Sequence, residues 1–246
     1  FVTFWEAVLL VVGGALAGVI NSMAGGGSTL TVPLLVLAGV PGNAANGSNR
    51  VGILASGFTA VASFHRRGAT AYREAAPVLL PVVVGSLVGS LGISRLADDT
   101  FETIFGLLLL PIIFLSIRKP KPRLDAEAWS RAMTTGVFGG IGLYGGAVQA
   151  GGGLVMLAAL SRAGYDLVTA NVIKMLVTVA VTLIALPVFI VQGNVRWGPA
   201  LVLTVGLAIG GWVGAHIAVK GGERVIRWVM VVAALGLAGR LLGLYG

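Results

Sequence analysis

The sequence has few charged residues and no cysteine. Only 11% of its 246 residues are charged, against about 25% in soluble domains. The lack of cysteine excludes disulfides, thiolate metal ligands and a cysteine nucleophile. With 57% hydrophobic residues and a mean hydropathy of +0.96, the chain cannot hide its apolar surface from water in one globule. We therefore expect an integral membrane protein in a lipid bilayer.

Acidic residues are absent from the middle of every apolar run. All nine lie at run ends or between runs: Glu6, Glu74, Asp98, Asp99, Glu102, Asp125, Glu127, Asp166 and Glu223. Cation pumps and carboxylate proton relays generally need a central acid, whereas an anion pathway does not. The sequence also has no phosphate-binding loop, His-Glu-x-x-His motif or paired carboxylates. We expect no enzyme activity, no cofactor and no metal site.

Ten apolar segments form two sets of five, and the second segment of each set is short. They are Phe4–Ile20, Thr29–Val40, Ser48–Phe64, Ala76–Leu96 and Phe101–Ile117, then Ala132–Val148, Leu154–Leu160, Val168–Gln192, Pro199–Val219 and Val225–Leu244. The first residues lack the basic start of a signal peptide, so we expect the first segment to remain as a helix. The sequence predicts a first membrane repeat over 1–117, a polar linker over 118–131 and a second repeat over 132–246.

Glycines mark the same places in both sets. Of 38 glycines, two triplets, Gly25–Gly27 and Gly151–Gly153, each follow the first segment of a set. A shift of 126 residues superposes the triplets. After a one-residue gap, a shift of 125 pairs further residues: Gly39 with Gly164, Ala45-Asn46 with Ala170-Asn171, Gly68 with Gly193, Tyr72 with Trp197, and Gly85 with Gly210. A nearly constant offset over a whole half indicates an internal duplication, which is a recurrent transporter design.

Loop charges indicate that the two repeats have opposite orientations. The basic loops 65–73 and 118–123 are expected in the cytoplasm, and the acidic loop 95–102 outside. The equivalents in the second half have the opposite character, since 193–197 carries one arginine and 220–227 is basic. We therefore expect an all-α polytopic membrane protein of two inverted repeats, with the N-terminus outside and the linker cytoplasmic. The net charge of +8 reflects this topology rather than nucleic-acid binding. The sequence leaves open whether the short segments cross fully or are re-entrant.

Each triplet interrupts an apolar run and opens a short helix inside the membrane. A helix begun there points free amides and its positive dipole end at a partner, which favours an anion. The alternative is that glycine only permits close helix packing. The third segment of each half adds a cation beside an asparagine: Asn46, Asn49 and Arg50 share a helix face, as do Asn171 and Lys174. Cations at membrane depth are usually functional, although they can also extend to the interface.

The candidate substrate-binding residues are these triplets, the polar residues beside them and the two cation faces. They are Asn21, Ser22, Gly25, Gly26, Gly27, Ser28, Thr29, Asn46, Asn49, Arg50, Tyr144, Gln149, Gly151, Gly152, Gly153, Asn171 and Lys174. Hydroxyls and amides could donate to an oxyanion. Ser and Thr before a helix could equally be caps, and Tyr144 could serve packing.

Several motifs resemble the TauE/SafE sulfite exporter family. In the first half they are Gly18-Val-Ile-Asn21-Ser-Met-Ala24-Gly25-Gly26-Gly27-Ser28, Val32-Pro33-Leu34-Leu35, Gly39-Val40-Pro41 and Ala45-Asn46-Gly47-Ser48-Asn49-Arg50-Val51. In the second half Gly142-Leu-Tyr144-Gly145-Gly146, Thr169-Ala170-Asn171 with Lys174, and Gly193-Asn-Val-Arg-Trp197 are similar to the family's patterns. The resemblance implies a bacterial or plant-type membrane carrier for sulfite, sulfonates or related organosulfur anions, and we expect it in the inner (plasma) membrane of a bacterium.

We therefore expect a transporter that moves sulfite or an organosulfonate by alternating access, with an anion site at the midplane between the repeats. The alternatives are an anion channel, a carrier of another anion such as a carboxylate, or a membrane scaffold for partner proteins. The sequence leaves open the exact anion, the direction, the coupling ion and self-association into an oligomer.

Overall fold

A computed structural model describes residues 2–23, 25–117 and 129–219, without the side chains of 109–117. The regular secondary structure of the described residues is all α-helical, as expected. Its helices are α1 (Phe4–Met23), α2 (Ser28–Leu37), α3 (Gly42–Arg66), α4 (Tyr72–Ile93), α5 (Asp98–Ile117), α6 (Arg131–Ala147), α7 (Gly152–Arg162), α8 (Leu167–Val191) and α9 (Trp197–Val219). The expected segment 225–244 and most of the linker lie outside the described residues.

The outer surface of the bundle is apolar, as expected for contact with lipid rather than water. Four described helices, α1, α4, α8 and α9, are long and apolar enough to cross a bilayer, while α2 and α7 are short apolar helices. Large apolar side chains point outward: Trp5 is 78% exposed, Leu80 73% and Val191 83%. Arg50 and Lys174, in contrast, are fully buried. An apolar surface around buried cations is stable where the surroundings are hydrocarbon, so the protein is integral to a membrane.

Helix boundaries recur with the offset found in the sequence. Helices α3 and α8 both span 25 residues, and each starts and ends 125 positions from the other. Helix α4 begins at Tyr72 and α9 at Trp197, which are aligned residues. Two aligned glycine pairs that follow helices, Gly39 with Gly164 and Gly68 with Gly193, all have positive φ. Positive φ is readily accessible only to glycine, which explains why these turns retain it in both halves.

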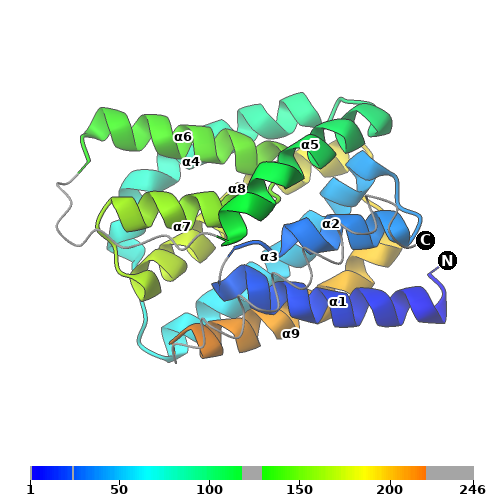
Figure 1. Cartoon of the computed structure of the whole chain (residues 1–246), viewed down its shortest axis with the longest axis horizontal. Coiled ribbons are helices and arrows are strands. Elements are labelled where there is room, and N and C mark those ends of the chain that lie inside the picture. The colour runs from blue at the N-terminus through cyan, green and yellow to red at the C-terminus, as the bar shows by residue number, and fades with distance from the viewer. Residues whose placement is uncertain (1, 24, 118–128, 220–246) are drawn as a thin grey trace.

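The first helix of each half packs against the fourth helix of the other half. Figure 1 shows α1 beside α9 and α6 beside α4, and these are extensive contacts. Glycines let the backbones touch. A Cβ at Gly18 or Gly210 would clash across the α1–α9 contact, and one at Gly89 or Gly146 across α4–α6. For these glycines, close packing is the structural role. In Figure 1, α1 starts at the right and runs left, whereas α6 starts at the left and runs right.

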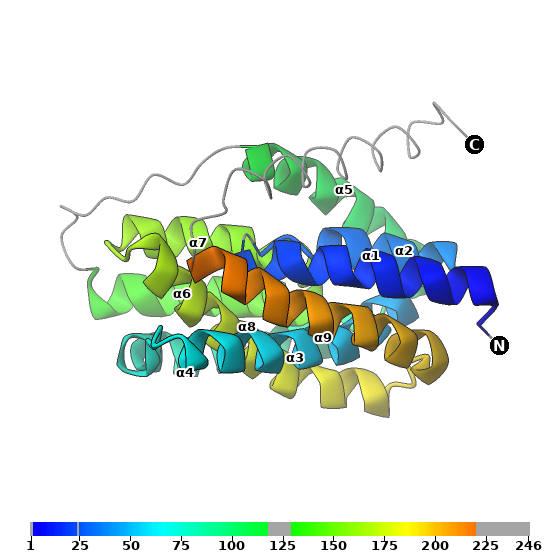
Figure 2. The ribbon, with the colours of Figure 1, turned by 90° about the horizontal axis from the view of Figure 1, so that it is seen from below.

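The buried apolar side chains form two clusters. One contains Phe64 from the end of α3 together with residues of α4, α6, α7 and α8. The other contains Phe189 from the end of α8, together with residues of α1, α2, α3, α5 and α9. Phe64 and Phe189 are aligned residues of the two halves. Helix α5 lies at the margin of the bundle, as Figure 2 shows.

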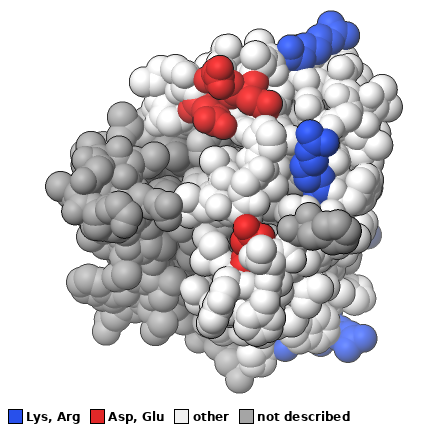
Figure 3. Space-filling view, turned by 90° about the vertical axis from the view of Figure 1, so that its right-hand side faces the viewer, with Lys and Arg blue, Asp and Glu red and all other residues white. Residues whose placement is uncertain are grey.

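The two ends of the bundle differ in charge. The first turn of α5 carries Asp98 and Asp99, and Asp98 Oδ1 accepts a hydrogen bond of 2.8 Å from the amide of Asn43 at the start of α3. Figure 3 shows exposed acidic side chains gathered at this end. The other end of α3, about 37 Å away along its axis, carries His65 and Arg66 in its last turn. The acidic loop and the basic loop that set the expected orientation are thus at opposite ends.

Candidate functional site

The two glycine breaks meet at the centre of the bundle. Gly25 and Gly151 have φ values of 82° and 67°, in the left-handed region. A Cβ at Gly25 would overlap the backbone of Gly153, and a Cβ at Gly153 would overlap that of Gly25. Only glycine allows this approach. The sequence placed both triplets at helix breaks, and the tertiary structure adds that the breaks are in backbone contact.

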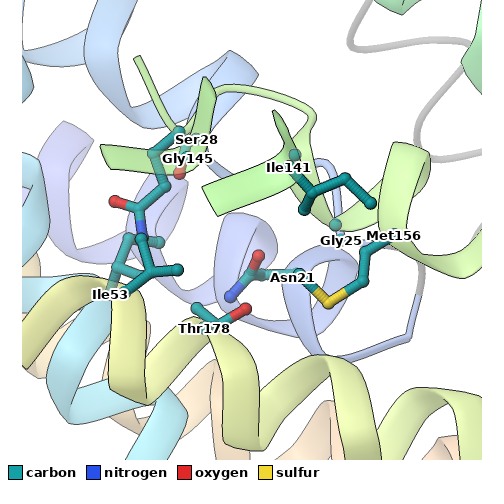
Figure 4. Close-up of a pocket in the computed structure, with 12 residues that line it drawn as sticks. Asn21, Gly25, Ser28, Ile53, Ile141, Gly145, Met156 and Thr178 are labelled. Atoms are coloured by element: carbon teal, nitrogen blue, oxygen red, sulfur yellow. The ribbon is translucent and has the colours of Figure 1, made fainter. Parts of the chain in front are cut away.

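A small cavity lies beside this contact. It is lined by Asn21, Gly25, Ser28, Ile53, Ile141, Gly145, Gln149, Gly152, Gly153, Met156, Thr178 and Val181. Its empty volume, including an open side, is about 370 Å³. The walls come from both halves, and the first turns of α2 and α7 border it (Figure 4). Little of this volume is enclosed: the space away from the open side holds about one or two water molecules, so a solute of several heavy atoms needs the walls to move apart.

Two amide side chains of this cavity have polar atoms without partners. Asn21 is 6% exposed and Gln149 7% exposed. Neither Asn21 Nδ2 nor Gln149 Oε1 has a hydrogen-bond partner. Figure 4 shows the Asn21 amide at the centre of the cavity between Thr178 and Met156. Of the nine buried side-chain atoms without a partner among the described residues, these two are the ones that belong to residues lining the cavity. Buried polar atoms in native proteins are nearly always paired, so the two favour a site that a ligand completes.

Arg50 closes the end of α6. Its guanidinium donates to the carbonyl oxygens of Gly145 at 3.2 Å, Gly146 at 2.6 Å and Ala147 at 3.1 Å. It also lies 4.5 Å from the centroid of the Phe189 ring. The last carbonyls of a helix have no partner within the helix, and its negative dipole end attracts a cation. Arg50 therefore provides hydrogen-bond partners for the last carbonyls of α6 within the bundle.

Lys174 does the same for α1. Its ammonium donates to the carbonyl oxygens of Asn21 at 2.7 Å and Ser22 at 3.0 Å, and to Asn171 Oδ1 at 2.8 Å. Three acceptors use all three ammonium hydrogens. Asn171 and Lys174, which the spacing of three places on one helix face, are thus hydrogen-bonded to each other.

Each of the two cations caps a helix of the other half. Arg50 belongs to the first half and caps α6 of the second; Lys174 belongs to the second half and caps α1 of the first. Each also fixes a cavity wall, because Gly145 and Asn21 line the cavity. In this structure neither cation lines the cavity itself. Their contact with a substrate was expected from the sequence; the structure shows instead a link from each cation, through the backbone, to a lining residue.

The remaining candidate residues bind the backbone around the breaks. Ser22 donates to the carbonyls of Gly18 and Gly211, Asn46 to that of Ala147, Thr29 to that of Gly26, and Tyr144 to that of Ala150. Asn49 accepts from Thr31, and Asn171 also donates to the carbonyl of Leu167. Gly27 packs against Ala17 and Asn21. Gly151 is the left-handed N-cap of α7, and Gly26 accepts from Thr29 through its carbonyl.

Half of the lining was not among the candidates. Those residues are Ile53, Ile141, Gly145, Met156, Thr178 and Val181. One signal was available: Ile53 and Thr178 are separated by 125 residues, so they are aligned positions three and four residues after Arg50 and Lys174. The apolar wall of α6, Ile141 and Gly145, has the spacing of one helix face but nothing in the sequence tells which face is inward.

Comparison with known proteins decides the family. The model of the sulfite exporter family TauE/SafE matches residues 10–241. The chain belongs to this family. The matched region covers both halves and includes every residue that lines the cavity.

Similar curated proteins carry matching names. A "Probable membrane transporter protein ORF9" from Sinorhizobium sp is 30% identical over 97% of this chain and 93% of its own. "Probable membrane transporter protein YfcA" of Escherichia coli K12 is 28% identical over 92% and 86%. A "Probable membrane transporter protein" of Haemophilus influenzae is 27% identical over 96% and 93%. No solved structure gives a comparable match. The chain is thus a member of a membrane transporter family, which agrees with the expected non-enzymatic role.

Proposed function

We propose that this TauE/SafE member transports sulfite or a small organosulfonate, which binds in the cavity between the two glycine breaks. The observation that carries the proposal is the buried, unpartnered Asn21 amide in a cavity bordered by the first turns of α2 and α7. Helix N-termini and a free amide N–H are donors that suit an oxyanion.

The electrostatics of the site support a negative ligand. No acidic side chain lines the cavity. The acidic residues in the described part of the chain lie in the first two turns of helices or at a helix cap, as Glu6, Glu74, Asp98 and Asp166 illustrate. Arg50 and Lys174 offset the negative ends of α6 and α1, which leaves the positive ends of α2 and α7 to act on the ligand.

We further propose that the two halves are inverted repeats that rock against each other. The opposite directions of α1 and α6, the recurrent helix bounds and the exchanged cation caps support this arrangement. The contact between Gly25 and Gly153 supports a carrier rather than an open channel, because backbone atoms of the two breaks fill the space where they meet. Rocking of the halves would separate them on one side at a time.

Counterflow in proteoliposomes tests the proposal. Vesicles loaded with unlabelled sulfite should accumulate labelled sulfite, saturably, and taurine, sulfoacetate and thiosulfate compete to the extent that they are substrates. Acetate in the same competition tests a carboxylate carrier. Transport that rises linearly with concentration and shows no counterflow would indicate a channel.

A pair of asparagine variants locates the site. Asn21→Leu keeps the side-chain size and removes the free donor, so counterflow should fall on the order of tenfold or more, the cost of one lost hydrogen bond to a charged group. Asn194→Leu is the control: the Asn194 side chain donates one hydrogen bond, to the Ser94 carbonyl at 2.7 Å, but does not line the cavity. Equal transport by both variants would contradict the assigned site.

A further inference from the structure

Gln149 is held in an unusual conformation at the break between α6 and α7. Its φ of 62° is the one positive value at a non-glycine residue in the described part of the chain. Left-handed backbone is uncommon for such residues and tends to occur at functional positions. Its own amide donates to the Tyr144 carbonyl at 3.3 Å, and its carbonyl accepts from Gly152 at 3.1 Å. The backbone of Gln149 is therefore tied to both helices, and its side chain enters the cavity from a fixed point.

The hydrogen bonds around Gln149 determine which end of its amide is free. Thr182 Oγ1 donates its single hydrogen to the carbonyl of Thr178 at 2.7 Å. The same oxygen lies 2.8 Å from the Gln149 amide, so it accepts there and the atom facing it is Nε2. The other end, Oε1, is buried without a partner. An oxygen accepts hydrogen bonds, so Oε1 can be satisfied only by a group that donates.

The residues that line the cavity thus provide one unpaired donor and one unpaired acceptor. Asn21 Nδ2 can donate to a negative oxygen, and Gln149 Oε1 requires a donor. We propose, on the basis of the anion site described above, that this site prefers those small anions that also carry a hydroxyl group, as hydrogen sulfite and hydroxysulfonates do, and that Gln149 Oε1 is the residue atom that recognises this hydroxyl. Gln149 is then a specificity-determining residue: the hydroxyl donates to Oε1 while the anionic oxygens face Asn21 and the first turns of α2 and α7.

A hydroxyl fits better than an ammonium group. An ammonium also donates, but it would enter a site whose lining has no carboxylate. Two lining residues, Gly145 and Asn21, are hydrogen-bonded through their carbonyls to the buried cations Arg50 and Lys174. Two buried cations directly behind the lining disfavour a third in a low-dielectric interior. An aprotic anion, in turn, would leave Oε1 unpaired, which a buried site penalises.

Matched ligands test this with the full-length protein. Glycolate, acetate and glycine differ only in a hydroxyl, a hydrogen or an ammonium on one carbon, and 2-hydroxyethanesulfonate, ethanesulfonate and taurine form the same series with a sulfonate. Isothermal titration in detergent should give the hydroxyl member of the accepted series an affinity on the order of tenfold above the aprotic member. The ammonium member should be weakest.

Variants assign the effect to Gln149. Gln149→Leu should abolish the preference for the hydroxyl ligand while the aprotic ligand still binds. Asparagine tolerates left-handed backbone but has a shorter side chain, which withdraws the amide from the ligand. Gln149→Asn should therefore reduce the preference for the hydroxyl ligand without removing anion binding. Gln192→Leu is the control, since Gln192 is exposed at the end of α8. Monodisperse elution of each variant establishes that it is folded.

The outcomes separate the inference from the proposed function. Binding of anions with equal affinity for hydroxyl and aprotic members overturns the role of Gln149 and leaves the anion site intact. A preference that survives in Gln149→Leu also overturns it. If no anion of either series binds to folded protein at millimolar concentration, the anion site itself is wrong, and the inference fails with it.

Discussion

Replacing Lys174 with methionine should destabilise the protein and weaken anion binding together. Methionine has nearly the volume of lysine but cannot donate, so the carbonyls of Asn21 and Ser22 and the Asn171 amide oxygen lose a partner. Hydrogen bonds to charged groups contribute about 1.5–3 kcal/mol each, and three of them about 5–9 kcal/mol. Removing a buried ammonium recovers several kcal/mol of desolvation. The expected net loss in unfolding free energy is therefore about 2–4 kcal/mol.

The assay is unfolding in mixed detergent micelles with increasing dodecyl sulfate, followed by far-UV circular dichroism. Arg95→Met is the control because Arg95 is an exposed cation near the end of α4, where a substitution should change stability by less than about 0.5 kcal/mol. Since Lys174 fixes the backbone of Asn21, anion affinity measured by titration should fall as well. An unfolding midpoint equal to that of Arg95→Met, with unchanged affinity, would refute the exchanged-cap argument.

Two further changes address the glycine break and a helix cap. Gly25→Ala should lower expression and thermal stability sharply, because φ is positive and a Cβ would overlap Gly153, whereas Gly140→Ala, with open space around it, should cost nothing measurable in the same melting experiment. Asp166 caps α8; partial burial raises its pKa, but hydrogen bonds from the first turn of α8 outweigh this and hold the pKa below its ordinary value. Its stabilisation should be present above about pH 3.9, the unfolded value, and lost as the pH falls toward the lower folded pKa. Melting curves should therefore show that Asp166→Ala lowers the unfolding free energy by about 1 kcal/mol near neutral pH and by less in acid. The control is Ser130→Ala, which removes the cap of α6 and should lower the unfolding free energy by a similar amount at every pH. An Asp166→Ala effect that does not change with pH would contradict the assignment.

Much of the fold could be predicted because membrane helices obey simple rules. The lengths of the apolar segments predicted the helices: the expected segment 168–192 is α8, and the expected short segment 154–160 is α7. The spacing of the glycines predicted which helices of the two halves correspond. The boundaries differ most at α3, which begins at Gly42 rather than Ser48. The missing turn is polar, with Asn43 and Asn46, and hydropathy does not detect a polar turn that is buried among other helices.

The site was only partly predictable. Of the residues that line the cavity, six were candidates from the sequence because they lie at or beside a helix break: Asn21, Gly25, Ser28, Gln149, Gly152 and Gly153. Thr178 and Met156 were not, since a threonine or methionine within an apolar helix is ordinary core. The partners of Arg50 and Lys174 could not be derived either, because they are backbone carbonyls, and every residue has one.

The sequence by itself determined that the chain is a membrane protein with a glycine triplet after the first apolar segment of each set and one cation in each third segment, and it predicted that the two sets are a duplication. Composition, hydropathy and spacing are properties of the chain alone, so they need no contact information. Only the tertiary structure decided that the breaks touch at Gly25 and Gly153, and that each cation caps the other half's broken helix. Those facts depend on which helix faces which, and this is set by close packing between α1 and α9 and between α4 and α6 rather than by any local pattern.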